Sequence, residues 1–93
     1  MTDWAMGERD WARAVASELG LRGYLVGSFA SHMARAVLAA DSGNLSRIGQ
    51  GFPHLVSVLS DYRQYGGEYL LAVAAGDDAA IIAAYEAYAE RVS

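Results

Sequence analysis

Apolar residues in this sequence recur three or four positions apart along most of its length, and no stretch alternates apolar and polar residues at every second position. The first spacing is typical of α-helices and the second of β-strands. The chain also has 18 alanines among its 93 residues, and alanine has the highest helix propensity. We therefore expect an all-α protein: a compact bundle of four to six helices with short connections, in a single domain over residues 1–93.

The composition narrows the class of protein and its compartment. The chain has no cysteine, which excludes disulfides, thiolate metal sites and cysteine nucleophiles. Its N-terminal stretch carries acidic residues rather than a basic region followed by an apolar run, so it does not resemble a signal peptide. The longest apolar runs are far shorter than the roughly 20 residues that a membrane span needs. We therefore expect a cytoplasmic protein that has no membrane partner.

The charge of the chain argues against partners that carry phosphate. Eleven acidic residues outnumber the seven basic residues, all of which are arginine, and the formal net charge is −4. An acidic chain is repelled by the phosphates of nucleic acids and of anionic lipids. We therefore do not expect nucleic acid to be a partner.

Start and stop signals divide the chain into six predicted helices. Asp41 or Ser42 can cap one helix and Asp77 another, and glycines suit the helix ends. Pro53 suits the first turn of a further helix. The expected helices cover residues 2–20, 21–40, 42–50, 53–65, 68–75 and 78–91. In the last of them, the residues expected to face inward are Ile81, Ile82, Tyr85, Tyr88 and Val92.

The second predicted helix, residues 21–40, has little polar surface. One side carries an apolar stripe, and the other side carries the small residues Gly23, Gly27 and Ser31. A helix with so few polar residues is buried on most sides, and small residues let a second backbone approach closely. We expect this helix to be either the centre of the bundle or half of a dimer seam formed by these three small residues. The protein could therefore be a homodimer.

Residues 15–29 have a spacing that resembles a helix-turn-helix. Ala16, Gly20 and Val26 stand where that motif places a small residue, the glycine of the turn and an aliphatic anchor. The resemblance implies a DNA-binding regulator, which stays open as an alternative. The candidate DNA contacts would be Arg22, Ser28 and Arg35. Most of the second helix would offer small or apolar side chains, whereas recognition needs polar or cationic ones. We therefore expect a packed core helix here.

The polar residues form no motif typical of a metal site or an active site. The two histidines, His32 and His54, fall on different predicted helices and have no partner at a metal-ligand spacing. The sequence has no nucleophile elbow and no glycine-rich phosphate loop after a strand. We expect no catalytic residue, no metal and no cofactor, and therefore no enzyme. A small ligand-binding helical bundle stays open as a second alternative.

Tyrosines gather in the segment DYRQYGGEY, residues 61–69. Three of them recur at helical spacing across a Gly-Gly break, and an arginine lies among them. Tyrosine and arginine contribute strongly to protein–protein binding, since they bury a large area and keep a polar end. The expected partner-binding residues are Asp61, Tyr62, Arg63, Tyr65, Glu68 and Tyr69. We expect this segment to bind a protein partner.

Residues 40–65, ADSGNLSRIGQGFPHLVSVLSDYRQY, resemble a stretch of small helical proteins of phages and other mobile elements. There, a helix with an asparagine runs into a Phe-Pro pair and then into an amphipathic helix with a tyrosine. The matching residues are Asn44, Leu45, Ile48, Phe52, Pro53, Leu55, Val56 and Tyr62. The resemblance implies an accessory role and transfers no catalytic residue. We therefore expect a non-catalytic interaction module that binds and modulates or inhibits a host protein complex, such as a defence system.

Overall fold

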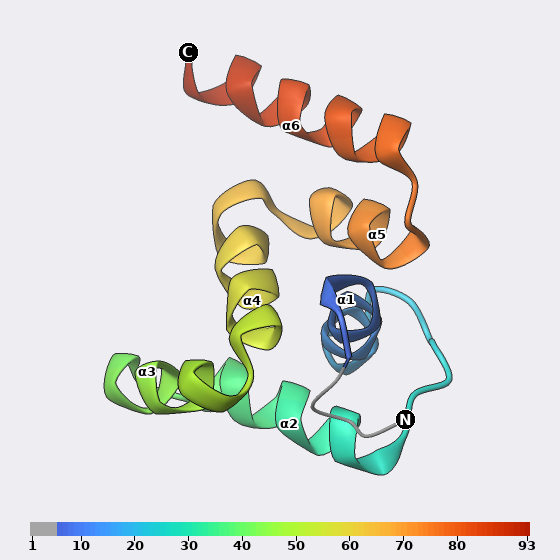
Figure 1. Ribbon diagram of the computed structural model, residues 1–93. Helices are drawn as coiled ribbons and strands as arrows, with labels where there is room; N and C mark the ends of the chain where they lie inside the picture. The colour runs from blue at the N-terminus through green and yellow to red at the C-terminus, as the bar shows by residue number, and fades with distance from the viewer. Residues whose placement is uncertain (1–5) are drawn as a thin grey trace.

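The structure, a computed structural model, describes residues 6–93 of the chain (Figure 1). This part consists of α-helices joined by loops and contains no β-strand. The helices are α1 (Glu8–Glu18), α2 (Ser28–Ala39), α3 (Ser42–Gly51), α4 (Pro53–Tyr65), α5 (Gly67–Ala75) and α6 (Asp78–Val92). None of these helices is long and apolar enough to cross a membrane. The prediction of an all-α bundle of four to six helices is confirmed.

Helix α1 lies at the centre of the bundle, among α2, α4 and α5 (Figure 1). Its Trp11 and Val15 are fully buried. The Trp11 ring meets the ring of Phe52 edge to face, with 5.9 Å between the ring centroids, an arrangement that aromatic pairs prefer. The expectation that residues 21–40 form the central helix is wrong, because α2 is shorter and buries only one of its sides.

Local signals account for where most helices begin and end. The side chain of Asp41 caps α3 by accepting a hydrogen bond from the backbone N–H of Asn44 (2.8 Å), and Asp77 caps α6 in the same way. Pro53 occupies the first turn of α4, where its missing N–H has no helical partner to lose. Gly76 ends α5 in the left-handed conformation, with φ 67°. The predicted bounds of the last four helices agree with the structure to within one residue.

The first two helices begin later than predicted. The expected start of the first helix, at residues 2–5, lies outside the described part, within which α1 begins at Glu8. Residues 19–27 form a loop, so that α2 begins only at Ser28. Three glycines lower the helix propensity of this loop, by about 1 kcal/mol each relative to alanine.

Side chains of α1 hold this loop in place. The Ser17 hydroxyl donates a hydrogen bond to the backbone carbonyl of Tyr24 at 3.5 Å. The guanidinium of Arg13 lies 5.7 Å from the centroid of the Tyr24 ring, within the range of a cation–π interaction. These contacts join residues seven or more positions apart, and they favour the loop over a longer second helix.

The loop removes the geometry of a helix-turn-helix from residues 15–29. That motif joins its helices by a turn of about three or four residues, whereas nine residues separate α1 from α2. Val26, the expected anchor of the second helix, lies in the loop, and so does Arg22. Arg35 is paired with Glu18, with 2.7 Å between Nε and Oε1. The predicted start of the second helix at residue 21 is therefore wrong, and residues 15–29 do not have the geometry of a helix-turn-helix.

The expected dimer seam is not a stripe on one helix. Gly23 and Gly27 lie in the loop and are exposed, and a Cβ added at either position would meet no atom within 4 Å. Ser31 lies on α2, and its hydroxyl donates a hydrogen bond to Oε2 of Glu18 in the same chain (3.3 Å). The prediction that these three small residues share one helix face is wrong, since the helix starts after the second glycine.

Helix α6 forms the outer edge of the molecule, on the far side of α5 from α1 (Figure 1). It packs on α5 and touches the end of α4. Of its 15 residues, all within the described part, only Ala84 is buried. One side of this helix is therefore covered by the bundle, and the opposite side faces solvent.

Candidate partner-binding surface

Four tyrosine rings meet where α4, α5 and α6 come together, and we call them the tyrosine cluster. Tyr65 is at its centre. The centroid of its ring lies 4.7 Å from that of Tyr69, 5.7 Å from that of Tyr85 and 4.9 Å from that of Tyr88. The rings are tilted or edge-on to one another, the geometries in which aromatic pairs attract. The cluster therefore holds α6 against the rest of the molecule.

The break between α4 and α5 positions two of these rings. Tyr65 is the last residue of α4, and Tyr69 lies near the start of α5. Between the helices, Gly66 has φ 97°, a conformation that residues with side chains rarely adopt. The chain can therefore turn sharply at this glycine and still bring tyrosines four positions apart into direct ring contact.

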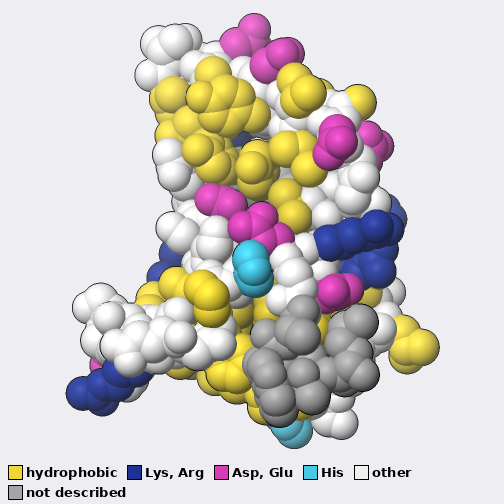
Figure 2. All heavy atoms as spheres, viewed as in Figure 1, with side chains coloured by type: hydrophobic (Ala, Val, Ile, Leu, Met, Phe, Trp, Pro, Cys, Tyr) yellow, Lys and Arg dark blue, Asp and Glu magenta, His cyan; other side chains and the backbone are white. Residues whose placement is uncertain are grey.

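The outer side of α6 carries an exposed apolar stripe. Ile82, Tyr85 and Val92 are 58%, 50% and 63% exposed. Together with the half-buried Ala89 they are spaced by three, four and three residues, which places them along one side of a helix. The α6 stripe, as we call these four residues, is continuous with the tyrosine cluster through Tyr85. Figure 2 shows apolar side chains gathered over α6 and the adjoining ends of α4 and α5.

The sequence prediction for α6 is partly wrong. It places all five large apolar residues of the helix inward, whereas only Ile81 and Tyr88 are half-buried. The neighbours of α6 lie on one side of it, and its large apolar residues occupy a wider arc than that side can cover. An apolar surface that the chain itself leaves exposed is typical of an interaction site.

Acidic residues border the α6 stripe. Glu86 and Glu90 are exposed and lie one helical turn apart, and Asp78 stands in the first turn of the same helix. In the sequence, residues 53–93 contain six acidic residues and two arginines, whereas residues 1–52 contain five of each. The whole net charge of −4 therefore belongs to the part of the chain that forms α4, α5 and α6.

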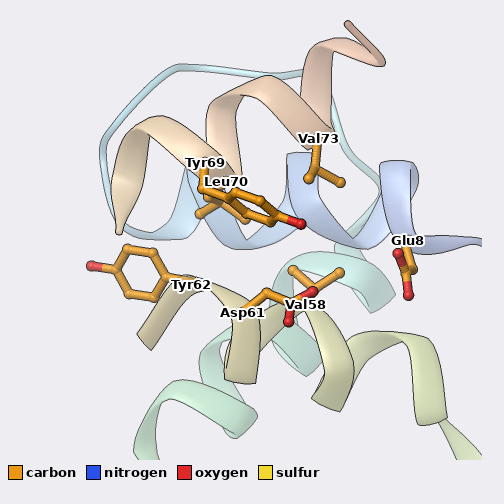
Figure 3. Close-up of a pocket in the computed structure, with 7 residues that line it drawn as sticks. All are labelled: Glu8, Val58, Asp61, Tyr62, Tyr69, Leu70 and Val73. Atoms are coloured by element: carbon orange, nitrogen blue, oxygen red, sulfur yellow. The ribbon is translucent and has the colours of Figure 1, made fainter. Parts of the chain in front are cut away.

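A small pocket lies between α1, α4 and α5 (Figure 3). Its lining residues are Glu8, Val58, Asp61, Tyr62, Tyr69, Leu70 and Val73. The hydroxyl of Tyr69 points toward the side where Asp61 and Glu8 lie, whereas the hydroxyl of Tyr62 points away from the pocket (Figure 3). The space inside, about 10 Å³, would hold roughly one water molecule. Sites for substrates or cofactors need far more room than this.

The carboxylates of this pocket act on each other and on Tyr69. Burial raises the pKa of Asp61 above its ordinary value, and the nearby charge of Glu8 raises the pKa further. Burial is also the main reason why the pKa of Tyr69 is raised, and the charge of Asp61 adds to it. Glu8 accepts a long hydrogen bond from the Ser57 hydroxyl (3.4 Å) and lies 4.0 Å from Nδ1 of His54.

The small volume of this pocket gives no support for a site of chemistry. A raised carboxylate pKa in a cleft can mark an active site, but this pocket has no room for a substrate beside Asp61. Within residues 6–93, no three His, Asp or Glu side chains are grouped so that they could hold a metal ion. The raised pKa of Asp61 therefore reflects how tightly α4 packs against α1 and α5.

The structure divides the six residues that the sequence predicts as partner contacts. The cluster contains Tyr65 and Tyr69, the pocket is lined by Asp61 and Tyr62, and the exposed pair is Arg63 and Glu68. The four residues of the cluster and pocket are half-buried and contact other parts of the same chain. Arg63 and Glu68 are exposed, and Glu68 lines a shallow hollow together with Arg22, Asp77 and Ala80.

The sequence analysis did not predict two features of this region: the position of Glu8 beside Asp61, and the exposure of Ile82 and Val92. Glu8 lies 53 positions from Asp61, and no local pattern indicates that the fold brings them together. The exposure of Ile82 and Val92 did leave a signal, since apolar residues cover a wider arc of the last helix than one packing face needs.

No family model matches this chain, and comparisons with curated proteins and with solved structures found no match either. The resemblance of residues 40–65 to accessory proteins of phages and mobile elements stays a prediction. The candidate surface is therefore supported by the geometry of this chain alone.

Proposed function

We propose that this chain is a non-catalytic protein–protein interaction module that binds its partner through the α6 stripe. The observation that carries the proposal is the exposure of Ile82, Tyr85 and Val92 on a helix that the bundle covers on one side only. Exposed apolar side chains in a row along one helix face are typical of a surface that a second molecule covers. Arg63 and Glu68 are exposed near the junction of α4 and α5, and they stay proposed polar contacts of the partner.

Tyr65 and Tyr69 of the tyrosine cluster support this function without being contacts themselves, whereas Tyr85 belongs to both the cluster and the α6 stripe. Tyr65 and Tyr69 hold α6 in place from within the chain, so the stripe is presented on a fixed helix. A surface that is ordered before binding loses less conformational entropy when the partner arrives. The expected roles of these two tyrosines therefore change from direct contact to support.

The biological setting that we propose follows from the resemblance of residues 40–65. The resemblance implies an accessory role, either binding and blocking a host protein or assisting assembly. We propose the same setting here: the chain binds a host protein complex and modulates or inhibits it. The exposed stripe supports the binding step, and no feature of the described residues bears on inhibition.

The proposal can be tested by exchanging one residue of the α6 stripe for a polar one. Ile82→Ser removes an exposed apolar side chain, so the fold should be unaffected while the contact is lost. Burying an isoleucine contributes about 1.5–3 kcal/mol, and each 1.4 kcal/mol is a factor of ten in affinity. We expect binding to weaken at least about tenfold, measured by light scattering on a size-exclusion column with and without an extract of the native cells.

A matched control is available on the opposite part of the molecule. Leu25 is fully exposed in the loop between α1 and α2, and Leu25→Ser removes an equally apolar side chain there. We expect this variant to enter the same complex as the unmodified chain. If both variants enter the complex equally well, or if Leu25→Ser alone fails to enter it, α6 is not the contact surface.

A further inference from the structure

The length of the α6 stripe indicates what kind of element can cover it. Ile82 and Val92 are ten residues apart, which is about 15 Å along a helix axis. This length matches about three turns of a partner helix. Helices that bind in this way insert side chains spaced by three, four and seven positions against the facing apolar row. The α6 stripe has the corresponding spacing of three, four and three.

The charges beside the stripe indicate the chemistry of that partner. Glu86 and Glu90 follow Ile82 at intervals of one turn, so the two carboxylates run along the edge of the apolar row. Asp78 adds a third acidic group at the N-terminal end of the same helix. Figure 2 shows acidic side chains around the apolar surface at this end of the molecule. Lysine or arginine flanking the apolar face of a partner would therefore meet opposite charge.

The same charges disfavour the other obvious occupants of the stripe. A second copy of the chain would bring the same acidic edge against its own, because the net charge of −4 belongs to residues 53–93. Anionic membrane surfaces and nucleic acids would be repelled as well. Among the partners that could bury the apolar stripe, a protein segment with basic residues fits these charges best.

We infer that the α6 stripe binds a basic amphipathic helix of about three turns in its protein partner, with the apolar face on Ile82, Tyr85 and Val92 and with lysine or arginine beside Glu86 and Glu90. This inference rests on the proposed interaction function and adds the chemical class of the partner element. The inference depends on both features together: the apolar row and the acidic residues lie side by side along the same helix.

The test uses defined peptides as probes of the full chain. The first probe is a labelled peptide of about 15 residues in which Leu and Lys alternate with helical periodicity. The second has the same composition in an order that leaves no apolar face, and the third replaces every Lys with Glu. Fluorescence anisotropy at about 50 mM and about 500 mM salt separates the apolar contribution to binding from the charge contribution.

We expect the Leu/Lys helix to bind at least about tenfold more tightly than either of the other peptides. Ile82→Ser should weaken its binding at least about tenfold. The double variant Glu86→Gln/Glu90→Gln should weaken it about three- to tenfold at low salt and much less at high salt. As a control, Asp10→Asn/Asp41→Asn removes two acidic charges from α1 and from the junction of α2 and α3, and should leave binding unchanged.

Four results would overturn the inference. Equal binding of the scrambled Lys peptide, unaffected by Ile82→Ser, would show attraction to charge alone. Equal binding of the Leu/Glu helix would show an apolar site without a preference for basic partners, and the proposed interaction function would then stand. Failure of all peptides to bind would remove the basic helix as the partner class, while the extract experiment still decides the proposed function. A dimer in light scattering that Ile82→Ser dissolves would show that a second copy covers the stripe.

Discussion

Asp61 is the side chain whose ionisation the fold most clearly opposes. Its pKa is raised by burial and by the charge of Glu8, so the ionised form costs stability in the folded protein. This cost is absent well below the ordinary pKa of 3.8, where the group is protonated in both states, and it grows as the pH rises through that value toward the higher folded pKa.

Asp61→Asn should therefore stabilise the protein at neutral pH. The substitution keeps the shape of the side chain and removes the charge. Because Asp61 is only partly buried, we expect a gain of about 0.5 kcal/mol or less in the free energy of unfolding, which should disappear at about pH 3. Urea unfolding at the two pH values measures this difference. An Asn variant that is less stable than the original chain at neutral pH would show that the carboxylate has a favourable partner.

Glu18 should show the opposite dependence on pH. The hydrogen bond from Arg35 lowers its pKa below the ordinary value of 4.5, with a smaller contribution from Ser31. The pair therefore stabilises the fold above about that pH, and this contribution is lost as the pH falls through the lowered pKa. Glu18→Gln should reduce the unfolding midpoint in urea at neutral pH and leave it unchanged at about pH 3. An equal reduction at both pH values would mean that the ionised form is not what matters.

At the scale of helices, the attachment of α6 depends on Tyr65. Its ring is the one that touches tyrosines of both α5 and α6. Tyr65→Ala should lower the free energy of unfolding by about 2 kcal/mol, because the ring is half-buried and its aromatic contacts are lost. Amide hydrogens of α6 should then exchange faster than those of α1. Tyr65→Phe keeps the ring and should behave like the original chain; an effect as large as that of alanine would assign the role to the hydroxyl instead.

The turn between α5 and α6 gives a second prediction about helices. Gly76 has φ 67°, and a Cβ there would lie 3.0 Å from the guanidinium carbon of Arg9. Gly76→Ala should destabilise the protein by about 1 kcal/mol. Gly49→Ala is the matched substitution inside α3, where the added Cβ would make an ordinary contact with Val56 at 3.6 Å. Gly49→Ala should be more stable than the original chain by up to about 1 kcal/mol. Thermal unfolding of both variants shows whether each substitution raises or lowers the stability. The same sign for both would contradict this account of the turn.

The helices that could be predicted from the sequence are those with local start and stop signals. Pro53 and the glycine pair after Tyr65 delimit α4, and the side chains of Asp41 and Asp77 mark where α3 and α6 begin. Residues 19–27 contain three glycines that disfavour a helix, but they have no proline or capping side chain, and their apolar residues continue the helical spacing of the neighbouring segments. The contacts of Tyr24 with α1 favour a loop over a helix in this segment. These contacts depend on how the helices pack, which local sequence does not show.

At the scale of the molecule, the chain is divided into two parts of different character. Residues 1–52 contain equal numbers of acidic residues and arginines, whereas residues 53–93, which form α4, α5 and α6, carry the whole net charge and the exposed apolar stripe. The sequence analysis predicted that the tyrosines of residues 61–69 bind a protein partner. It could not show whether they would face a partner or α6, since that depends on where Tyr85 and Tyr88 lie in space.

The central claim is that the exposed side of α6 contacts another protein. The most direct measurement places a photo-crosslinking residue at position 82 in one variant and at position 25 in another, and irradiates cells that produce each. Both positions are exposed in this fold, Leu25 more than Ile82, so poorer access would not explain the lack of a product from position 25. We predict one discrete crosslinked protein from position 82 and no such product from position 25. No product from position 82, or the same product from both positions, would contradict the claim.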